Sequence, residues 1–259
     1  MDLQLAGKTA LITGSYRGTG RGIAGVLAAE GAHVVIHGFA SGQADPVAQE
    51  LVDAGFSAEA VTSDIRSDTA MDHLVDVASR VDVLVNNYGA PGGSSWSSMV
   101  NWEEEWNVNV LAAVRVTQAC MPAMRDRGWG RIIFMGTVGT QQPGNRNVGY
   151  YGAKTALPTL VRTLAMELRG SGVTANLVSP GMIATDEVQA MIMRRAARDG
   201  HGESWEQSER WALDNSMPNL TERLPTPGDI GSVVAFVASE AAWHITGADI
   251  AVDGGARDA

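Results

Sequence analysis

The amino-acid sequence predicts an α/β protein whose core is one parallel, doubly wound β-sheet. Short β-rich runs alternate with longer helical patterns along most of the chain, an order typical of successive strand–helix–strand units. The chain has 259 residues, of which 45% are hydrophobic and 30 are glycine, so it can bury one large core and make many tight turns. No internal repeat, low-complexity tract or linker marks a boundary, and residues 1–259 are expected to form a single domain.

About seven strands and about six helices are expected in this fold. The predicted strands cover residues 9–13, 33–37, 57–62, 81–85, 131–135, 173–178 and 250–252. The predicted helices cover residues 20–29, 46–54, about 69–79, about 102–124, 150–168 and 229–239. Because strands and helices alternate, the sheet is expected to be parallel and buried.

The segment from about residue 182 to 224 interrupts this alternation. It holds two short helical patterns separated by a break at residues 199–202, and we interpret it as an inserted helical lid. Ser204-Trp205-Glu206-Gln207 has the form of a capping box, which predicts a second lid helix from Trp205 to about Leu213. The apolar lid side chains either line a substrate pocket or pack onto the core or a neighbouring subunit. They are Val188, Met191, Ile192, Trp205, Trp211 and Met217.

Composition excludes several classes of function. The formal net charge of -10 argues against nucleic-acid binding, which depends largely on clustered Lys and Arg. The first residues lack the basic start and apolar stretch of a signal peptide, and no run approaches the roughly 18 apolar residues of a membrane span. A cytoplasmic protein is therefore expected. The single cysteine, Cys120, allows neither an intramolecular disulfide nor a cysteine zinc cluster, and we expect no metal site and a buried, inert thiol.

A glycine-rich loop directly follows the first predicted strand and opens the first helix. In this context such a loop binds a dinucleotide, because its backbone can approach the pyrophosphate, whose charge then sits at the positive end of the helix. The residues concerned are Gly14, Ser15, Arg17, Gly18, Thr19 and Gly20. An ordinary strand-to-helix turn is the alternative. Three residues separate Gly14 from Gly18 where the common dinucleotide motif has one, and this spacing resembles the short-chain dehydrogenase/reductase family.

The resemblance runs nearly from end to end and implies a single Rossmann-type domain. Asp64 and Ile65 follow the third strand, where the family contacts adenine, and Asn86-Asn87-Tyr88-Gly89 stands where the family has Asn-Asn-Ala-Gly. The segment 180–185 resembles the one that covers the nicotinamide. The resemblance therefore implies these further cofactor-binding residues: Asn87, Gly89, Pro180, Gly181, Ile183 and Thr185. It also implies a homo-oligomer, a tetramer or a dimer.

The sequence favours NADP(H) over NAD(H). NAD-preferring relatives carry an acid at the end of the second strand to hold the ribose hydroxyls, whereas this chain has Gly38 there. Arg17 matches the basic residue that NADP-using members direct at the 2′-phosphate, for which a forked guanidinium is well suited. His37 and Ser41 are candidates to assist it. The alternative for Arg17 is a solvated loop charge.

Tyr150 and Lys154 are four residues apart at the start of a helical pattern, so their side chains share one face. A free tyrosine has a pKa of about 10, and acid/base work near neutral pH requires a nearby positive charge. The resemblance assigns Tyr150 as proton donor to a carbonyl and Lys154 as holder of the cofactor ribose that also lowers the tyrosine pKa. It assigns Asn109 as anchor of a proton-relay water.

Two positions depart from the family pattern. The serine that polarises the substrate oxygen is replaced by Thr137, thirteen residues before Tyr150; its methyl group restricts the rotamer and takes pocket volume. Thr140 is a less favoured substitute. Tyr88 replaces a small alanine near the cofactor, with no sequence-level account of how its ring is accommodated. Tyr151, three residues before Lys154, is the alternative register for the proton donor.

These residues predict an NADP(H)-dependent oxidoreductase that interconverts a ketone and a secondary alcohol by hydride transfer. An apolar or aromatic carbonyl compound is the slightly favoured substrate, with Trp96 in a loop where the family builds a substrate wall. A 3-oxoacyl thioester and a ring ketone are both candidates. A catalytically impaired NADP(H)-binding sensor or structural protein, and a lyase or epimerase on the same fold, are the alternatives because fold does not fix chemistry.

Overall fold

The computed structural model describes residues 2–67, 74–201 and 204–256, and a fully parallel sheet is its central layer. In the described residues the sheet has seven strands in the spatial order β3-β2-β1-β4-β5-β6-β7, so the predicted doubly wound fold is confirmed. The strands are β1 Thr9–Ile12, β2 His33–Gly38, β3 Ala58–Thr62, β4 Val83–Asn86, β5 Gly130–Met135, β6 Val173–Pro180 and β7 Asp249–Val252. The strand order reverses between β1 and β4, the place where such sheets bind ligands.

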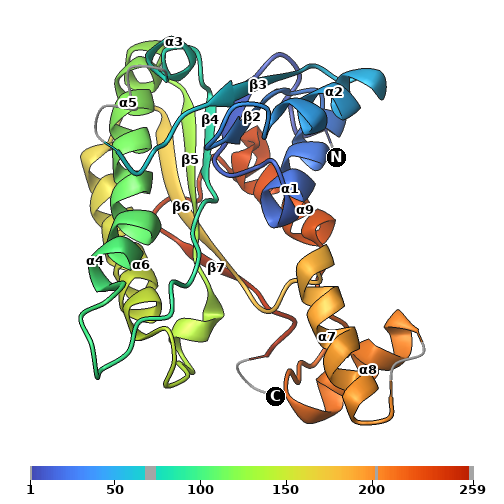
Figure 1. Ribbon diagram of the computed structural model, residues 1–259. Helices are drawn as coiled ribbons and strands as arrows, with labels where there is room; N and C mark the ends of the chain where they lie inside the picture. The colour runs from blue at the N-terminus through green and yellow to red at the C-terminus, as the bar shows by residue number, and fades with distance from the viewer. Residues whose placement is uncertain (1, 68–73, 202–203, 257–259) are drawn as a thin grey trace.

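Helices cover both faces of this sheet (Figure 1). One side carries α1 Gly18–Ala29, α2 Asp45–Asp53 and α9 Pro227–Ala238, and the other carries α3 Val75–Ala78, α5 Ala112–Arg127 and α6 Val148–Glu167. Each side has its own buried apolar cluster. In β1, Ala10 and Ile12 face one cluster and Leu11 faces the other. Because successive strand residues point to opposite faces, both sets must be apolar, and this explains the hydrophobic strand runs.

The long helix predicted over residues 102–124 is interrupted by a π-helical segment. It consists of α4 Trp102–Trp106, the π-helical segment Asn107–Leu111, and α5. Within that segment the Asn109 side-chain amide donates to the backbone carbonyls of Ala90 and Glu105, both at 2.9 Å. π-helical turns of this kind often occur at functional sites. Of the helix predicted over about residues 69–79, the structure describes α3; residues 68–73 lie outside the described part of the chain.

The predicted lid consists of α7 Asp186–Arg198 and α8 Trp205–Asn215, which extend beyond the sheet (Figure 1). The Ser204 hydroxyl accepts a hydrogen bond from the Gln207 backbone amide, so the predicted start of α8 at Trp205 is confirmed. The apolar lid side chains pack on one another in a small separate cluster that includes Ile192, Leu213 and Leu224. The lid thus has a core of its own, separate from the two clusters against the sheet, and the substrate-pocket role of these side chains stays a prediction. No helix in the described ranges is long and apolar enough to cross a membrane.

Helices α1 and α9 pack so closely that a side chain is excluded at Gly22. A Cβ atom there would lie 2.3 Å from the Pro227 Cβ atom, whereas a Cβ at Gly25, one turn later, would meet nothing within 4 Å. We expect Gly22→Ala to lower the free energy of unfolding by about 1–3 kcal/mol through overpacking. Gly25→Ala, the matched control, should raise it by about 0.5–1 kcal/mol because alanine is the better helix former. Urea unfolding measures both, and equal effects would contradict this account of the interface.

Candidate active site

The glycine-rich loop between β1 and α1 is held in place by polar contacts from its neighbours. Gly14 and Gly18 have φ values of 65° and 55°, in the left-handed region that favours glycine. The Ser15 hydroxyl donates to the Ile12 carbonyl at 2.7 Å, and the Asn87 side-chain amide donates to the Thr13 carbonyl at 2.8 Å. Among the residues that the structure describes, no side chain caps the N-terminus of α1, so its first amides are available to an anion. The loop therefore fits a pyrophosphate.

His37 supports this loop, and both of its ring nitrogens are hydrogen-bonded to backbone groups. It is completely buried. Its Nδ1 accepts a hydrogen bond from the Gly14 backbone amide at 3.0 Å, so Nε2 carries the proton and donates to the Ser63 carbonyl at 2.9 Å. Burial lowers the pKa of His37 to about 4, which keeps the ring neutral. His37 thereby fixes the position of Gly14, and its expected contact with the cofactor stays a prediction.

The structure accommodates the Tyr88 ring in an aromatic cluster above the loop. Its ring centroid lies 4.3 Å from that of Phe39, which directly follows β2, and its side chain covers Gly14. The Tyr16 and Phe39 rings meet edge to face at 6.4 Å. Half-buried rings thus gather beside the end of β2, where dinucleotide-binding folds hold the adenosine ribose. Tyr88 extends an apolar surface beside this end of the loop.

Three other residues predicted to contact the cofactor already interact with other parts of the protein. Asp64 binds Arg66 through two side-chain hydrogen bonds of 2.7 and 2.8 Å, and this pairing lowers the pKa of the carboxyl group. The Ile65 side chain is buried in the core. Arg17 is exposed, and its guanidinium lies 3.7 Å from the Glu187 carboxylate on α7. An exposed ion pair of this length is weak, so Arg17 remains free to turn toward a phosphate.

Tyr150 and Thr137 meet where α6 begins beside the end of β5. The Thr137 hydroxyl oxygen accepts a hydrogen bond from the Gly139 amide at 3.1 Å and also shares a hydrogen bond with the Tyr150 hydroxyl. The Thr140 hydroxyl is occupied elsewhere, since it donates to the Thr137 carbonyl at 3.0 Å. The Tyr151 ring packs edge-on against Tyr150 at 5.4 Å. The hydrogen bond with Thr137 favours Tyr150 as the proton donor, although the Tyr151 ring also approaches Gly139 beside Thr137.

Lys154 and Asn109 converge on Gly89. A Cβ atom at Gly89 would lie 2.7 Å from both the Lys154 Nζ and the Asn109 Oδ1 atoms, so only glycine fits. Lys154 is buried and donates to the Met135 carbonyl at 2.8 Å. Asn109 Oδ1 is buried without a hydrogen-bond partner in the structure. An unpaired acceptor beside an ammonium group that still has donors to offer is suited to holding a bound water or a ligand hydroxyl.

Burial sets the proton affinities of this group. It raises the pKa of Tyr150 to about 12, with a smaller opposing effect from the Thr137 hydrogen bond, and it lowers the pKa of Lys154 to about 8. The effect that opposes this rise in the Tyr150 pKa comes from Thr137, while the Lys154 ammonium group donates to the Met135 carbonyl. The lowering of the tyrosine pKa by Lys154 stays a prediction. Desolvation therefore dominates both groups.

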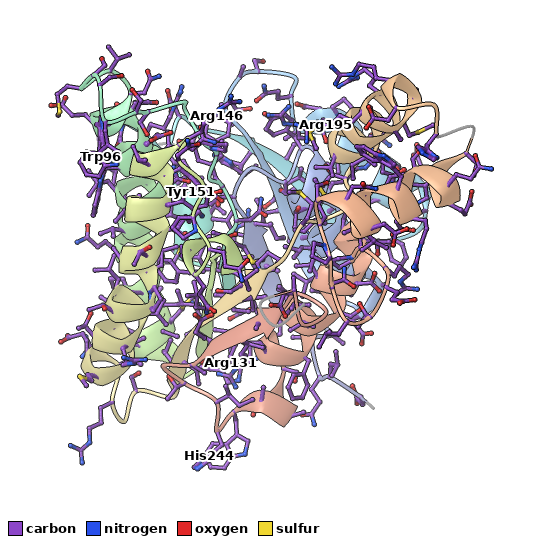
Figure 2. All side chains as sticks on the ribbon, turned by 90° about the horizontal axis from the view of Figure 1, so that it is seen from below. Trp96, Arg131, Arg146, Tyr151, Arg195 and His244 are labelled. Atoms are coloured by element: carbon purple, nitrogen blue, oxygen red, sulfur yellow. The ribbon has the colours of Figure 1, made fainter. Side chains whose placement is uncertain are left out.

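The remaining predicted residues lie at the same edge of the sheet, and one lies outside the site. Pro180 ends β6, the backbone of Gly181 approaches Asp253, and Ile183 packs partly against the core. Thr185 caps α7, and its methyl group lies 3.8 Å from the Cβ position of Gly18, so the lid starts beside the phosphate loop. Trp96 is 84% exposed and sits at the outer edge of the molecule, whereas Tyr151 lies further in (Figure 2).

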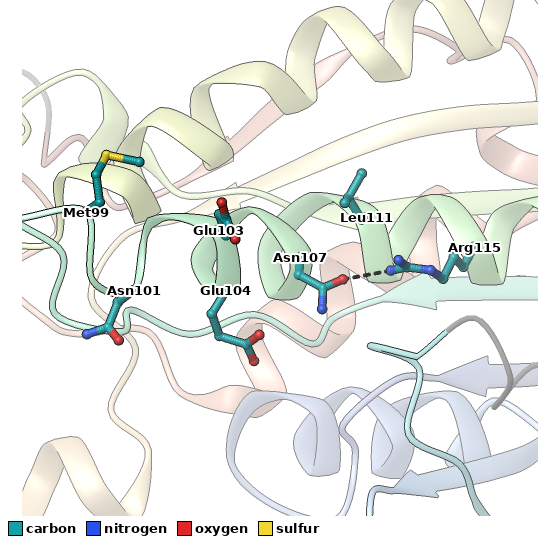
Figure 3. Close-up of a pocket in the computed structure, with 7 residues that line it drawn as sticks. All are labelled: Met99, Asn101, Glu103, Glu104, Asn107, Leu111 and Arg115. Carbon is teal, nitrogen blue, oxygen red and sulfur yellow. Dashed lines mark hydrogen bonds between the residues drawn. The ribbon is translucent and has the colours of Figure 1, made fainter.

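Sequence reasoning missed a buried carboxylate, Glu105, and its partner Ser94. Three glutamates occupy positions 103–105, and only Glu105 is buried, with 1% of its surface exposed. The other two line a surface pocket of about 580 Å³ on the outer side of α4 (Figure 3). That pocket is lined by Met99, Asn101, Glu103, Glu104, Asn107, Leu111 and Arg115. The apolar residues on either side of the acidic run do not reveal which glutamate faces inward.

Known proteins resemble this chain over its whole length. Residues 8–195 match the family model described as short chain dehydrogenase. D-beta-hydroxybutyrate dehydrogenase of Cupriavidus necator is 31% identical, over 97% of this chain and 98% of that protein. 3-Oxoacyl-[acyl-carrier-protein] reductase of Aquifex aeolicus is 32% identical, over 98% and 99%. L-Sorbose reductase of Gluconobacter frateurii, solved with NADPH and L-sorbose, superposes with a TM-score of 0.90 at 29% identity over the full length of both chains.

The buried ammonium of Lys154 should make stability depend on pH when no cofactor is bound. Because its pKa is lowered from 10.5 to about 8, the unfolded chain binds more protons than the native protein between these pH values. Stability should therefore rise with pH through this window, by up to about 3 kcal/mol. Two buried groups with raised pKa values act in the opposite direction, Cys120 above about pH 9 and Tyr150 above about pH 10, so the contribution of Lys154 is isolated by comparison with a variant that keeps both.

Urea unfolding at pH 7.5 to 10 measures this effect, with Lys154→Met as the comparison. The variant should lack the rise that the parent shows, and it should be the more stable of the two below pH 8. Parallel pH curves for the two proteins would contradict the assignment.

Proposed function

The chain belongs to the short-chain dehydrogenase family, and from this premise we propose that it is an NADP(H)-dependent enzyme that interconverts a ketone and a secondary alcohol, with Tyr150 as general acid/base. Membership makes the chain an oxidoreductase that acts on CH–OH and C=O groups and binds a nicotinamide cofactor. The finer assignments rest on the site. The observation that carries them is the pairing of the Thr137 and Tyr150 hydroxyls at the start of α6, the helix that also carries Lys154, at the sheet edge that the phosphate loop also reaches.

Thr137 and Tyr150 supply two hydroxyl groups to one carbonyl oxygen. Because the Thr137 oxygen accepts from the Gly139 amide, its hydrogen is directed outward and can be donated to Tyr150 or to a substrate. In the reducing direction Tyr150 gives its proton to the carbonyl oxygen as negative charge develops there. The bound nicotinamide supplies the hydride. Lys154 and Asn109 then offer a donor and an unpaired acceptor through which a proton can return to Tyr150 from solvent.

The proposed preference for NADP(H) rests on charge at the end of β2. Gly38 leaves this position without the acid that would repel a 2′-phosphate, and Arg17 supplies an exposed guanidinium in the phosphate loop. Among the similar structures, L-sorbose reductase holds NADPH and a 7α-hydroxysteroid dehydrogenase holds NADH. The family alone therefore does not decide between the two, and the local charge carries the proposal.

A panel of carbonyl compounds and alcohols, followed by NADPH absorbance, tests the function as a whole. Hydroxy acids, sugar ketones, 3-oxoacyl thioesters and ring ketones belong in it. Turnover of any ketone or secondary alcohol supports the proposal. NADPH binding without turnover across the panel would favour a cofactor-binding sensor instead. The homo-oligomer stays a prediction, which sedimentation velocity can measure.

Tyr150→Phe should reduce kcat by about 10²- to 10⁴-fold, the usual contribution of general acid catalysis, while NADPH binding stays nearly intact. The substitution removes the proton donor but keeps the ring. Tyr151→Phe is the matched control, since its ring packs against Tyr150 and it should lose little activity. Steady-state kinetics and a fluorescence titration measure the two effects. If Tyr151→Phe is the inactive variant, the proton donor is the next residue along the helix.

Arg17→Ala should weaken NADPH binding by about 10- to 100-fold and leave NADH binding almost unchanged, as expected for the loss of charge-assisted hydrogen bonds to a 2′-phosphate. Arg21→Ala is the control, because Arg21 already pairs with Glu50 at 2.6 Å on the outer side of α1. Calorimetric titration with each cofactor gives the dissociation constants. Equal losses for NADPH and NADH would show that Arg17 does not read the phosphate.

A further inference from the structure

The buried Glu105 carboxylate is fully engaged with the loop that follows β4. One oxygen, Oε1, accepts a hydrogen bond from the Gly92 backbone amide, and the other, Oε2, accepts one from the Ser94 hydroxyl. Glu105 and Ser94 are 1% and 2% exposed, so water does not compete for these bonds. A buried side chain whose two oxygens both accept hydrogen bonds is held in a fixed position.

Ser94 connects this carboxylate to the helix that carries Tyr150. Its hydroxyl oxygen accepts a hydrogen bond of 2.7 Å from the Gly149 backbone amide, in the first turn of α6. A Cβ atom at Gly149 would lie 2.5 Å from Glu105 Oε2, so the close approach requires glycine. Tyr150 is the next residue in the chain. The sequence of bonds therefore runs from Glu105 through Ser94 to the turn that sets the position of Tyr150.

The N-terminus of α6 has no cap of its own. Asn147 precedes the helix with φ 61° and makes no side-chain capping bond. The first amides of a helix need acceptors, and negative charge is favourable beside them. Ser94 and Glu105 provide both from a different part of the chain. Glu105 also contacts Asn109, because its backbone carbonyl accepts a hydrogen bond from the Asn109 side-chain amide at 2.9 Å.

We propose that Glu105 is a positioning residue for the reaction: through Ser94 it fixes the first turn of α6, and through its backbone carbonyl it orients Asn109. It thereby holds Tyr150 at a constant distance from the loop at residues 90–98. The inference rests on the proposed role of Tyr150 as proton donor. It assigns no contact between Glu105 and substrate.

Glu105→Gln tests this role with a minimal change of shape. A glutamine has one acceptor oxygen where the carboxylate has two, so either Gly92 or Ser94 loses its acceptor and meets an amide donor instead. We expect kcat to fall about tenfold or more while the dissociation constant for NADPH stays within about twofold. Glu103→Gln is the matched control, two residues away on the exposed face of α4, and its kcat should equal that of the parent.

Two further measurements separate positioning from a general loss of structure. If Glu105 acts through Ser94, the double variant Glu105→Gln/Ser94→Ala should lose no more kcat than the more impaired single variant. Amide hydrogen exchange in the cofactor-free protein should speed up at residues 148–152 in Glu105→Gln and remain unchanged in Glu103→Gln. That readout needs no substrate, so it remains valid if Tyr150→Phe proves active and the proposed function fails. Three results would overturn the proposal. They are additive losses of kcat in the double variant, unchanged exchange at residues 148–152 in Glu105→Gln, and a loss of NADPH affinity in Glu105→Gln as large as its loss of kcat.

Discussion

Burial of the sheet on both faces is the constraint on which the rest of the molecule depends. Two apolar clusters, one under each layer of helices, occupy the space above and below every inner strand. In the central strands β1, β2 and β4 the polar side chains thereby stand at or next to the strand ends. The residues proposed to bind ligands or to react therefore lie at one edge of the sheet. They belong to the loop after β1, the loop after β4, the turn after β5 and the start of α6. The strand order also reverses there, which is where doubly wound sheets bind their ligands.

Within that edge, buried polar groups form two separate supports. His37 holds the phosphate loop through Gly14, and Glu105 holds the start of α6 through Ser94. Both supports consist of a buried side chain that bonds backbone amides, so each one fixes main-chain positions. The groups proposed to meet the ligands, such as Arg17 and Asn109 Oδ1, instead keep bonding capacity free. This arrangement is common in active sites, where buried side chains fix the positions of the residues that contact ligands.

The fold could be predicted from the sequence because its signal is repeated in every strand and helix. The site could be predicted in part, since Tyr150, Lys154, Thr137 and Asn109 stand at spacings that a family pattern matches. His37 illustrates the limit: the sequence places a histidine at a strand end but does not show that both of its ring nitrogens bond to backbone groups. Glu105 illustrates another limit, because the π-helical segment that follows α4 changes which residues face inward. Such a shift depends on tertiary contacts that no local pattern encodes.

The neutral ring of His37 has a consequence for the acid tolerance of the phosphate loop. A protonated Nδ1 could no longer accept the Gly14 amide, so two N–H groups would face each other inside the core. With a pKa of about 4, the ring stays neutral across the pH range found inside most cells. The geometry of the loop therefore does not change when the pH falls moderately within that range. Histidine side chains often act as pH sensors, but burial among its neighbours prevents His37 from changing its charge near neutral pH.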